Sequence, residues 1–384
     1  MDGASVKIER TSRLLPALVG VLLVLQLAAP YRGWLALLVG LGAGWLVSYW
    51  WAATLARRLR LRRKLRLEWA SVGDRLEETF TLSNNRWARG VWVEVAAGST
   101  LPDYRPGRIT GADAHTTVQW RAEGVCLKRG LFTLGPTHLH TADPLGLYTV
   151  SQTYPQVTTM IVTPRIVSLP AIEVAPGGRA GQGRPRANAP EPTVSAAGVR
   201  DYTPGDSLHR VHWPTSARRQ TLSVRLFDST PAGDWWIFLD LEQQAQAGRG
   251  DESTEEHGII LAASLADRGL RRRRAVGLVA CGQELVWLPP RPGEEQRWRI
   301  LRSLALLEPG DQPLSALLSR ARPAFGQLAS LIIITPAAGN WVETLPLLLR
   351  RGVVPTVLFL DPAAFGGEES AAAVTAILKK LKVA

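Results

Sequence analysis

The chain has 384 residues, 46% of them hydrophobic, and a formal net charge of +12. This composition excludes an intrinsically disordered protein, and the length allows a membrane hairpin and two soluble domains. The two cysteines, Cys126 and Cys281, exclude a disulfide framework and a cysteine-built zinc site, and we predict that both are buried as small apolar side chains.

Two apolar segments near the N-terminus predict a transmembrane helical hairpin within residues 1–56. They run over about residues 14–30 and 33–55 and are joined by a tight turn. A bilayer core of about 30 Å needs about 20 helical residues, so the second segment is long enough and the first is slightly short. The alternative is that residues 1–29 form a cleavable signal peptide.

Seven basic residues follow the second apolar segment within ten positions. They are Arg57, Arg58, Arg60, Arg62, Arg63, Lys64 and Arg66. Their place beside an apolar segment favours a topology signal, so we expect the lipid bilayer as a partner and no nucleic acid. By the positive-inside rule, the chain is predicted to be a multi-pass protein of the cell membrane with its soluble domains on the cytoplasmic side.

Residues 57–170 are predicted to hold this basic juxtamembrane segment and an antiparallel β-sandwich. Polar and apolar residues alternate over Glu77–Leu82 and Val91–Val95, with a turn signal at Ser83–Arg86 between them, as is typical of short strands. Residues 171–198 are rich in Pro, Gly, Ala and Arg and lack periodicity, which predicts a flexible linker or loop.

Residues 199–384 are predicted to hold a signature segment followed by an α/β domain. The continuous apolar runs Trp235–Asp240 and Leu331–Thr335 predict buried strands, and Glu255–Leu270 has helical spacing. Apolar strands that alternate with helices imply a mostly parallel sheet covered on both faces.

The most specific local pattern lies in Arg200–Arg218. Pro204–Gly205 predict a turn, and Asp206 can cap the helix that follows. Three side chains would then lie near one face of that helix: Leu208, Val211 and His212. We predict a structural brace, in which arginines pair with nearby aspartates through forked hydrogen bonds. The arginines are Arg200, Arg210 and Arg218, and the aspartates are Asp201 and Asp206.

Two alternatives to the brace remain open. The same arginines, together with His209 and His212, would bind an anion or a protein partner. A catalytic alternative uses His212 as a base for Ser216, although a serine four residues after a histidine has no geometric claim to be a nucleophile.

This segment resembles the signature of the bacterial domain-of-unknown-function family fifty-eight, in the run R-x-Y-x-x-G-D-x-x-x-R-x-x-W-x-x-x-A-R. The positions that carry the resemblance are Arg200, Tyr202, Gly205, Asp206, Arg210, Trp213 and Arg218. Arg129–Pro136, Asp143–Leu147 and Thr163–Arg165 also look like landmarks of that family. The resemblance implies a membrane-anchored protein with a β-sandwich and a C-terminal von Willebrand factor A-like domain, often encoded beside MoxR-type AAA+ ATPases.

The von Willebrand resemblance implies a divalent-metal site that this sequence does not complete. Such domains bind the ion through D-x-S-x-S after the first strand, with a Thr and an Asp from later loops. Here Asp240 matches, but Glu242 and Gln244 replace the serines, and no Asp follows Thr335 nearby. We therefore expect a degenerate site and no metal or other cofactor.

The sequence favours a non-enzymatic scaffold that docks a protein partner, such as a MoxR-type AAA+ ATPase, through the von Willebrand-like domain. Among short catalytic patterns, the P-loop, GxGxxG, HExxH and GxSxG motifs do not occur. The alternative is a hydrolytic or metal-dependent enzyme that uses Asp240 or the Arg200–Arg218 segment.

Overall fold

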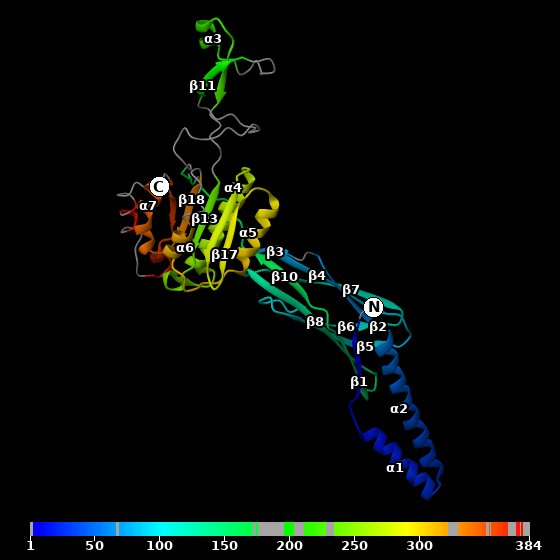
Figure 1. Ribbon diagram of the computed structural model, residues 1–384. Coiled ribbons are helices and arrows are strands. Elements are labelled where there is room, and N and C mark those ends of the chain that lie inside the picture. The colour runs from blue at the N-terminus through cyan, green and yellow to red at the C-terminus, as the bar shows by residue number, and fades with distance from the viewer. Residues whose placement is uncertain are drawn as a thin grey trace. The chain divides into compact units, whose positions relative to one another are not determined.

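The computed structural model divides into two compact units, Met1–Pro164 and Arg165–Ala384. The residues that it describes are 3–66, 69–170, 172, 174–175, 196–202, 211–227, 234–321, 329–350, 353, 355–367, 374–376 and 378. Figure 1 shows both units, and we describe each by itself.

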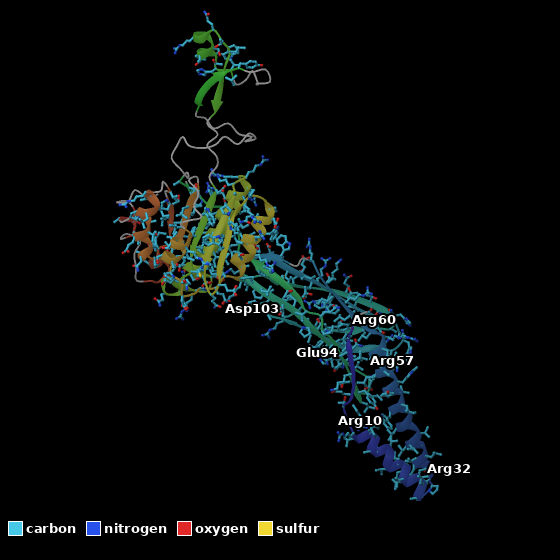
Figure 2. The ribbon with its side chains drawn as sticks, in the orientation of Figure 1. Arg10, Arg32, Arg57, Arg60, Glu94 and Asp103 are labelled. Carbon is cyan, nitrogen blue, oxygen red and sulfur yellow. The ribbon has the colours of Figure 1, made fainter. Side chains whose placement is uncertain are left out.

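The first unit begins with strand β1 (Ser5–Arg10) and two helices, α1 (Leu14–Ala28) and α2 (Arg32–Arg58), which lie side by side in Figure 1. Helix α2 is long and apolar enough to cross a membrane, whereas α1 is a shorter apolar helix. Figure 2 places Arg32 at the tip of this hairpin and Arg57 at the end where α2 meets the strands. Strand β1, which the sequence analysis did not predict, pairs with β9 (Tyr148–Tyr154).

The rest of the first unit consists of two sheets. In one, β2 (Leu59–Leu65), β4 (Arg75–Asn84) and β7 (Thr116–Val125) are antiparallel. The other follows the order β1-β9-β8-β10-β3, with β5 attached to β8 and β6 attached to β5. Its further strands are β3 (Trp69–Ser71), β5 (Gly90–Ser99), β6 (Arg108–Ala112), β8 (Gly130–Ala142) and β10 (Thr158–Thr163).

The two sheets share one hydrophobic core. Phe80 and Leu82 of β4 pack in the same cluster as Val93 and Val95 of β5 and Leu139 of β8, and all five are buried. These positions alternate along each strand, because successive side chains of a strand point to opposite faces. The alternation predicted for Glu77–Leu82 is therefore the pattern that forms this core.

Strand β2 is a second difference from the sequence analysis, which treated its residues only as a basic segment. Leu59 and Leu61 are buried in the shared core, whereas Arg60, Arg62 and Lys64 are exposed. Because basic residues alternate with leucines over Leu59–Arg62, a segment predicted to act as a topology signal also forms part of the core.

The second unit contains a five-stranded sheet in the order β17-β16-β13-β18-β19. Four strands are parallel: β13 (Trp235–Asp240), β16 (Val276–Cys281), β18 (Ser330–Thr335) and β19 (Pro355–Phe359). Only β17 (Leu285–Arg291) is antiparallel, at one edge. The prediction of a mostly parallel C-terminal sheet is confirmed.

Helices cover both faces of this sheet. Ile237 and Leu239 pack against α4 (Thr254–Arg271) and α5 (Glu294–Leu306), whereas Phe238 packs against α6 (Leu314–Ala321) and α7 (Leu345–Arg350). Helix α4 begins with a cap, because the Ser253 hydroxyl accepts a hydrogen bond from the Glu256 amide at 3.2 Å. The sequence analysis did not predict α6, and the 3-10 helix η4 (Asn340–Thr344) precedes α7.

Short elements complete the second unit. They are β11 (Ala196–Asp201), α3 (Trp213–Arg219), β12 (Ser223–Phe227), η2 (Gln243–Ala245), β14 (Gly248–Arg249), β15 (Glu252–Ser253) and η5 (Pro362–Phe365). Strands β11 and β12 form an antiparallel pair of their own.

Candidate functional site

Asp240 ends β13, the middle strand of the five-stranded sheet. The next parallel strand along the chain, β16, lies on one side of β13, and the later strand β18 lies on the other. Asp240 is therefore at the point where the strand order reverses, which is where open α/β sheets bind ligands. Sequence and topology thus agree on this edge as the candidate site.

The carboxylate of Asp240 is enclosed by its neighbours, and the residue is only 4% exposed. Its Oδ2 accepts a hydrogen bond from the Thr335 hydroxyl at 2.7 Å, and its Oδ1 accepts one from the Glu242 amide at 3.2 Å. Burial raises the pKa of this carboxyl above its ordinary value, although these two hydrogen bonds act in the opposite direction. The Thr335 side chain and the Glu242 backbone thus both contact the Asp240 carboxylate.

The loop after β13 is fastened over the same edge. The side-chain nitrogen Nε2 of Gln246 donates to the backbone carbonyl oxygens of Asp240 and Glu242, at 3.2 and 3.3 Å. The Thr254 hydroxyl, at the start of α4, donates to the Gln246 side-chain oxygen at 2.8 Å. The sequence analysis missed Gln246 because a glutamine six residues after a strand has no distinctive pattern.

Asp240 and Glu242 are the acidic residues at the end of β13, and Glu242 is half-buried. In the described part of the chain, no group of three or more His, Cys, Asp or Glu side chains could hold a metal ion. The arrangement holds the Asp240 carboxylate in place and fixes the path of the loop after β13.

The signature positions are only partly described. Arg200 belongs to β11, and the half-buried Tyr202 donates its backbone N–H to the Leu222 carbonyl at 2.8 Å. Trp213 begins α3 and is 65% exposed, and Arg218 is also exposed. Three positions lie outside the described residues: Gly205, Asp206 and Arg210. The brace therefore stays a prediction.

Around α3 the structure corrects one expectation. The helix begins at Trp213, with Val211 in a β-bridge to Val224, so the placement of Val211 and His212 on a helical face is wrong. Val211 has a strand conformation because it pairs with Val224 of β12.

The His212 ring and the Ser216 hydroxyl have different partners. The His212 Nδ1 lies 2.7 Å from the Thr215 hydroxyl. Ser216 donates to the His212 carbonyl at 3.0 Å and accepts from the Ser223 amide at 2.9 Å. Ser216 thus links α3 to β12 through backbone groups.

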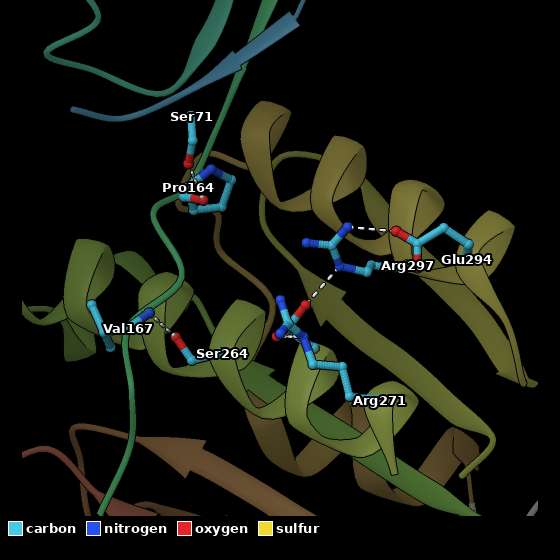
Figure 3. A network of polar contacts seen from close by, with 8 residues as sticks. Ser71, Pro164, Val167, Ser264, Arg271, Glu294 and Arg297 are labelled. Atoms are coloured by element: carbon cyan, nitrogen blue, oxygen red, sulfur yellow. Dashed lines mark hydrogen bonds and ion pairs between the residues drawn. The ribbon is translucent and has the colours of Figure 1, made fainter. Parts of the chain in front are cut away.

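A charged cluster joins α4 to α5, and the sequence analysis did not identify it (Figure 3). The Asp267 carboxylate, 7% exposed, meets Arg271 Nε at 2.7 Å and Arg297 Nε at 2.6 Å. Arg297 Nη1 also meets Glu294 at 2.6 Å. A cavity of about 270 Å³ lies beside this cluster. The i, i+4 spacing of Asp267 and Arg271 was its one sequence signal.

Comparison with known proteins places the signature in a family. The family described as "Protein of unknown function DUF58" matches residues 198–336. The uncharacterized protein YeaD of Bacillus subtilis (strain 168) is 29% identical over 111 residues, which cover 29% of this chain and 26% of YeaD. The uncharacterized protein Rv1480 of Mycobacterium tuberculosis (strain ATCC 25618 / H37Rv) is 26% identical over 184 residues, which cover 45% of this chain and 57% of Rv1480. The chain thus spans only part of each relative.

Among solved structures, a complex of zinc 2-glycoprotein and prolactin inducible protein from human seminal plasma is similar to part of this chain. The match covers 28% of this chain and 96% of that chain, at 7% identity and a TM-score of 0.22. A likeness this weak supports no conclusion about fold or function.

Proposed function

Since the chain belongs to the DUF58 family through residues 198–336, we propose that it is a membrane-anchored scaffold whose α/β unit docks a protein partner. The observation that carries the proposal is that the Asp240 carboxylate is buried and hydrogen-bonded within its own unit. Both of its carboxylate oxygens accept hydrogen bonds from the same unit, from Thr335 and from the Glu242 backbone. The acid therefore holds the edge of the sheet in shape, and the surface above it is free to serve recognition.

Strand order supports a von Willebrand factor A-like assignment for this unit. Counted from β13, the order is 3-2-1-4-5, with the third strand antiparallel. This order is typical of doubly wound α/β domains, which bind at the carboxyl ends of their strands. The partner that we propose for this edge is a MoxR-type AAA+ ATPase, on the strength of the family resemblance.

The anchor that we propose is a transmembrane hairpin of α1 and α2 in the cell membrane, followed by a β-sandwich on the cytoplasmic side. No charged residue occurs between Arg13 and Arg32 or between Arg32 and Arg57, so charges bracket two apolar segments. Strand β1 supports a retained N-terminal segment, because a cleaved signal peptide would remove a strand that pairs with β9.

The test is capture of the partner by the full chain, purified from native membranes in a mild detergent. Gln244 is exposed at the carboxyl edge, and Arg272 is exposed after α4, away from that edge. We expect Gln244→Trp to reduce the captured partner several-fold, and Arg272→Trp to leave it unchanged. Equal capture by the two variants would place the docking surface elsewhere or reject the scaffold.

An enzyme is the second candidate, and one observation favours it. Burial raises the pKa of Asp240, as in many acids that exchange protons during catalysis. Titration of the full chain with Mg²⁺ and Mn²⁺ separates the two candidates. The scaffold predicts no tight binding, whereas one-site binding that Asp240→Ala abolishes would favour a metal-dependent enzyme.

A further inference from the structure

The first unit exposes an apolar rim beside the end of α2. It consists of Trp50 of α2, Trp87 in the β4–β5 loop, and Val91 and Trp92 of β5, which are 58%, 38%, 63% and 41% exposed. Val91 and Trp92 are neighbours in a strand, where side chains normally alternate between faces. Both are exposed because the β5–β6 register shifts between Gly90 and Val93.

Direct contacts attach this rim to the membrane helix. The Trp51 indole N–H donates to the Arg89 carbonyl at 3.0 Å. The Trp87 ring lies 4.8 Å from the Trp50 ring and 4.9 Å from the Trp51 ring, centroid to centroid. The β4–β5 loop is therefore held at a fixed position along α2.

Helix lengths place that position at the bilayer surface. Helix α1 has 15 residues, which at a rise of about 1.5 Å each gives about 22 Å, short of a hydrocarbon core of about 30 Å. The last turns of α2 cannot add to the spanning length, because Ala52 and Ala56 are buried in a cluster with Tyr148 and Val150 of β9. A hairpin this short spans the hydrocarbon core only if the strands beside the end of α2 lie within the headgroup layer.

We propose that this rim is a membrane-contact surface, seated in the interfacial layer of a phospholipid bilayer. Tryptophan is enriched at that layer because its ring is apolar and its N–H is polar. Arg86 and Arg89 are exposed on the same loop and suit anionic phosphate headgroups. This inference rests on the membrane anchor of the proposed function.

The test uses variants of the full chain that each carry one introduced cysteine, reconstituted in vesicles of phosphatidylcholine and phosphatidylglycerol in equal amounts. The native Cys126 and Cys281 are buried, so a maleimide fluorophore reports the introduced cysteine. Val91→Cys probes the rim, and Leu37→Cys probes the exposed apolar face of α2. The matched control is Leu131→Cys, an exposed residue of β8 beyond the far end of β5, where Ser99 pairs with Leu134.

We expect bromine-labelled lipids to quench the probes at residues 37 and 91 several-fold more than the probe at residue 131. Aqueous iodide should show the reverse order. Quenching at residue 37 alone would overturn the rim and leave the anchor standing. Equal lipid quenching at residues 91 and 131 would also overturn a specific rim. A probe at residue 37 that iodide reaches freely would overturn both the anchor and the inference.

Discussion

At the scale of single residues, Asp240 links the candidate site to the stability of the α/β unit. Its pKa is raised above the ordinary value of an aspartate, mainly by burial. A carboxyl group with a raised pKa in the folded state binds its proton more tightly there than in the unfolded chain. Its contribution to stability is therefore fully present below the unfolded pKa and is lost as the pH rises through the folded pKa.

We predict that the unfolding free energy of the wild type falls across this pH window, relative to Asp240→Asn, which keeps the shape but does not titrate. Thr335→Val should widen the window toward higher pH and cost about 1–3 kcal/mol, because it removes a hydrogen bond from a buried carboxylate. Urea unfolding at several acid pH values, followed by tryptophan fluorescence, measures both effects. Parallel pH profiles for the wild type and Asp240→Asn would contradict the prediction.

At the scale of elements, two ion pairs that differ in burial join β4 to β2 and to Arg66, the residue that follows β2. Arg63 and Glu78 meet at 2.6 Å, with side chains 14% and 0% exposed, and the Tyr104 hydroxyl also donates to Glu78, at 2.7 Å. Arg66 and Glu77 meet at 2.9 Å but are 72% and 31% exposed. The adjacent pairs thus form a natural comparison between buried and exposed charge.

Glu78→Gln is expected to destabilise the first unit by about 3 kcal/mol, because it leaves the mostly buried Arg63 cation without its counter-charge. Glu77→Gln is the matched control and should cost about 0–1 kcal/mol, since exposed pairs contribute little. The measurement is the urea midpoint of the full chain in detergent. Equal shifts for the two variants would mean that the buried pair contributes no more than the exposed one.

How far the elements could be predicted depends on how strongly they are buried. Strands β13 and β18 matched their predicted ranges closely, because every residue in them is buried and the runs are continuously apolar. Strand β1 was missed although Ser5–Glu9 alternate polar and apolar residues, because the segment is short and almost wholly exposed. Helix α6 was missed because it has only eight residues.

The same reasoning applies to the candidate site. Asp240 and Thr335 end adjacent parallel strands, so the sequence could predict that they lie at one edge. The contact of Arg297 with Asp267 could not be predicted, because it depends on how α5 packs against α4. Nor could the exposed pair of Val91 and Trp92, because the register shift in β5 is set by its pairing with β6.

At the scale of the whole molecule, charge and helix length bear on the membrane anchor that we propose. Arg32 is the single charge at the tip of the hairpin, whereas the opposite end carries Arg10 and Arg57, together with Arg13 before α1 and Arg58 at the end of α2. For the proposed anchor, the positive-inside rule predicts the strand-bearing end in the cytoplasm and the tip on the opposite side. The 15 residues of α1 would make the proposed crossing short, so the position of the tip is the sensitive test.

We predict that Tyr31→Cys, at a tip residue 65% exposed, reacts with a membrane-impermeant maleimide added to intact cells. Leu131→Cys, on the body, should react only after the cells are permeabilised. The background is low, because Cys126 and Cys281 are buried and burial raises the pKa of both thiols, which keeps them protonated and unreactive. Labelling of Leu131→Cys in intact cells would show that the topology is the reverse of the predicted one. If Tyr31→Cys does not react with the maleimide in intact cells, the hairpin enters the bilayer without crossing it. The short first helix would account for that result.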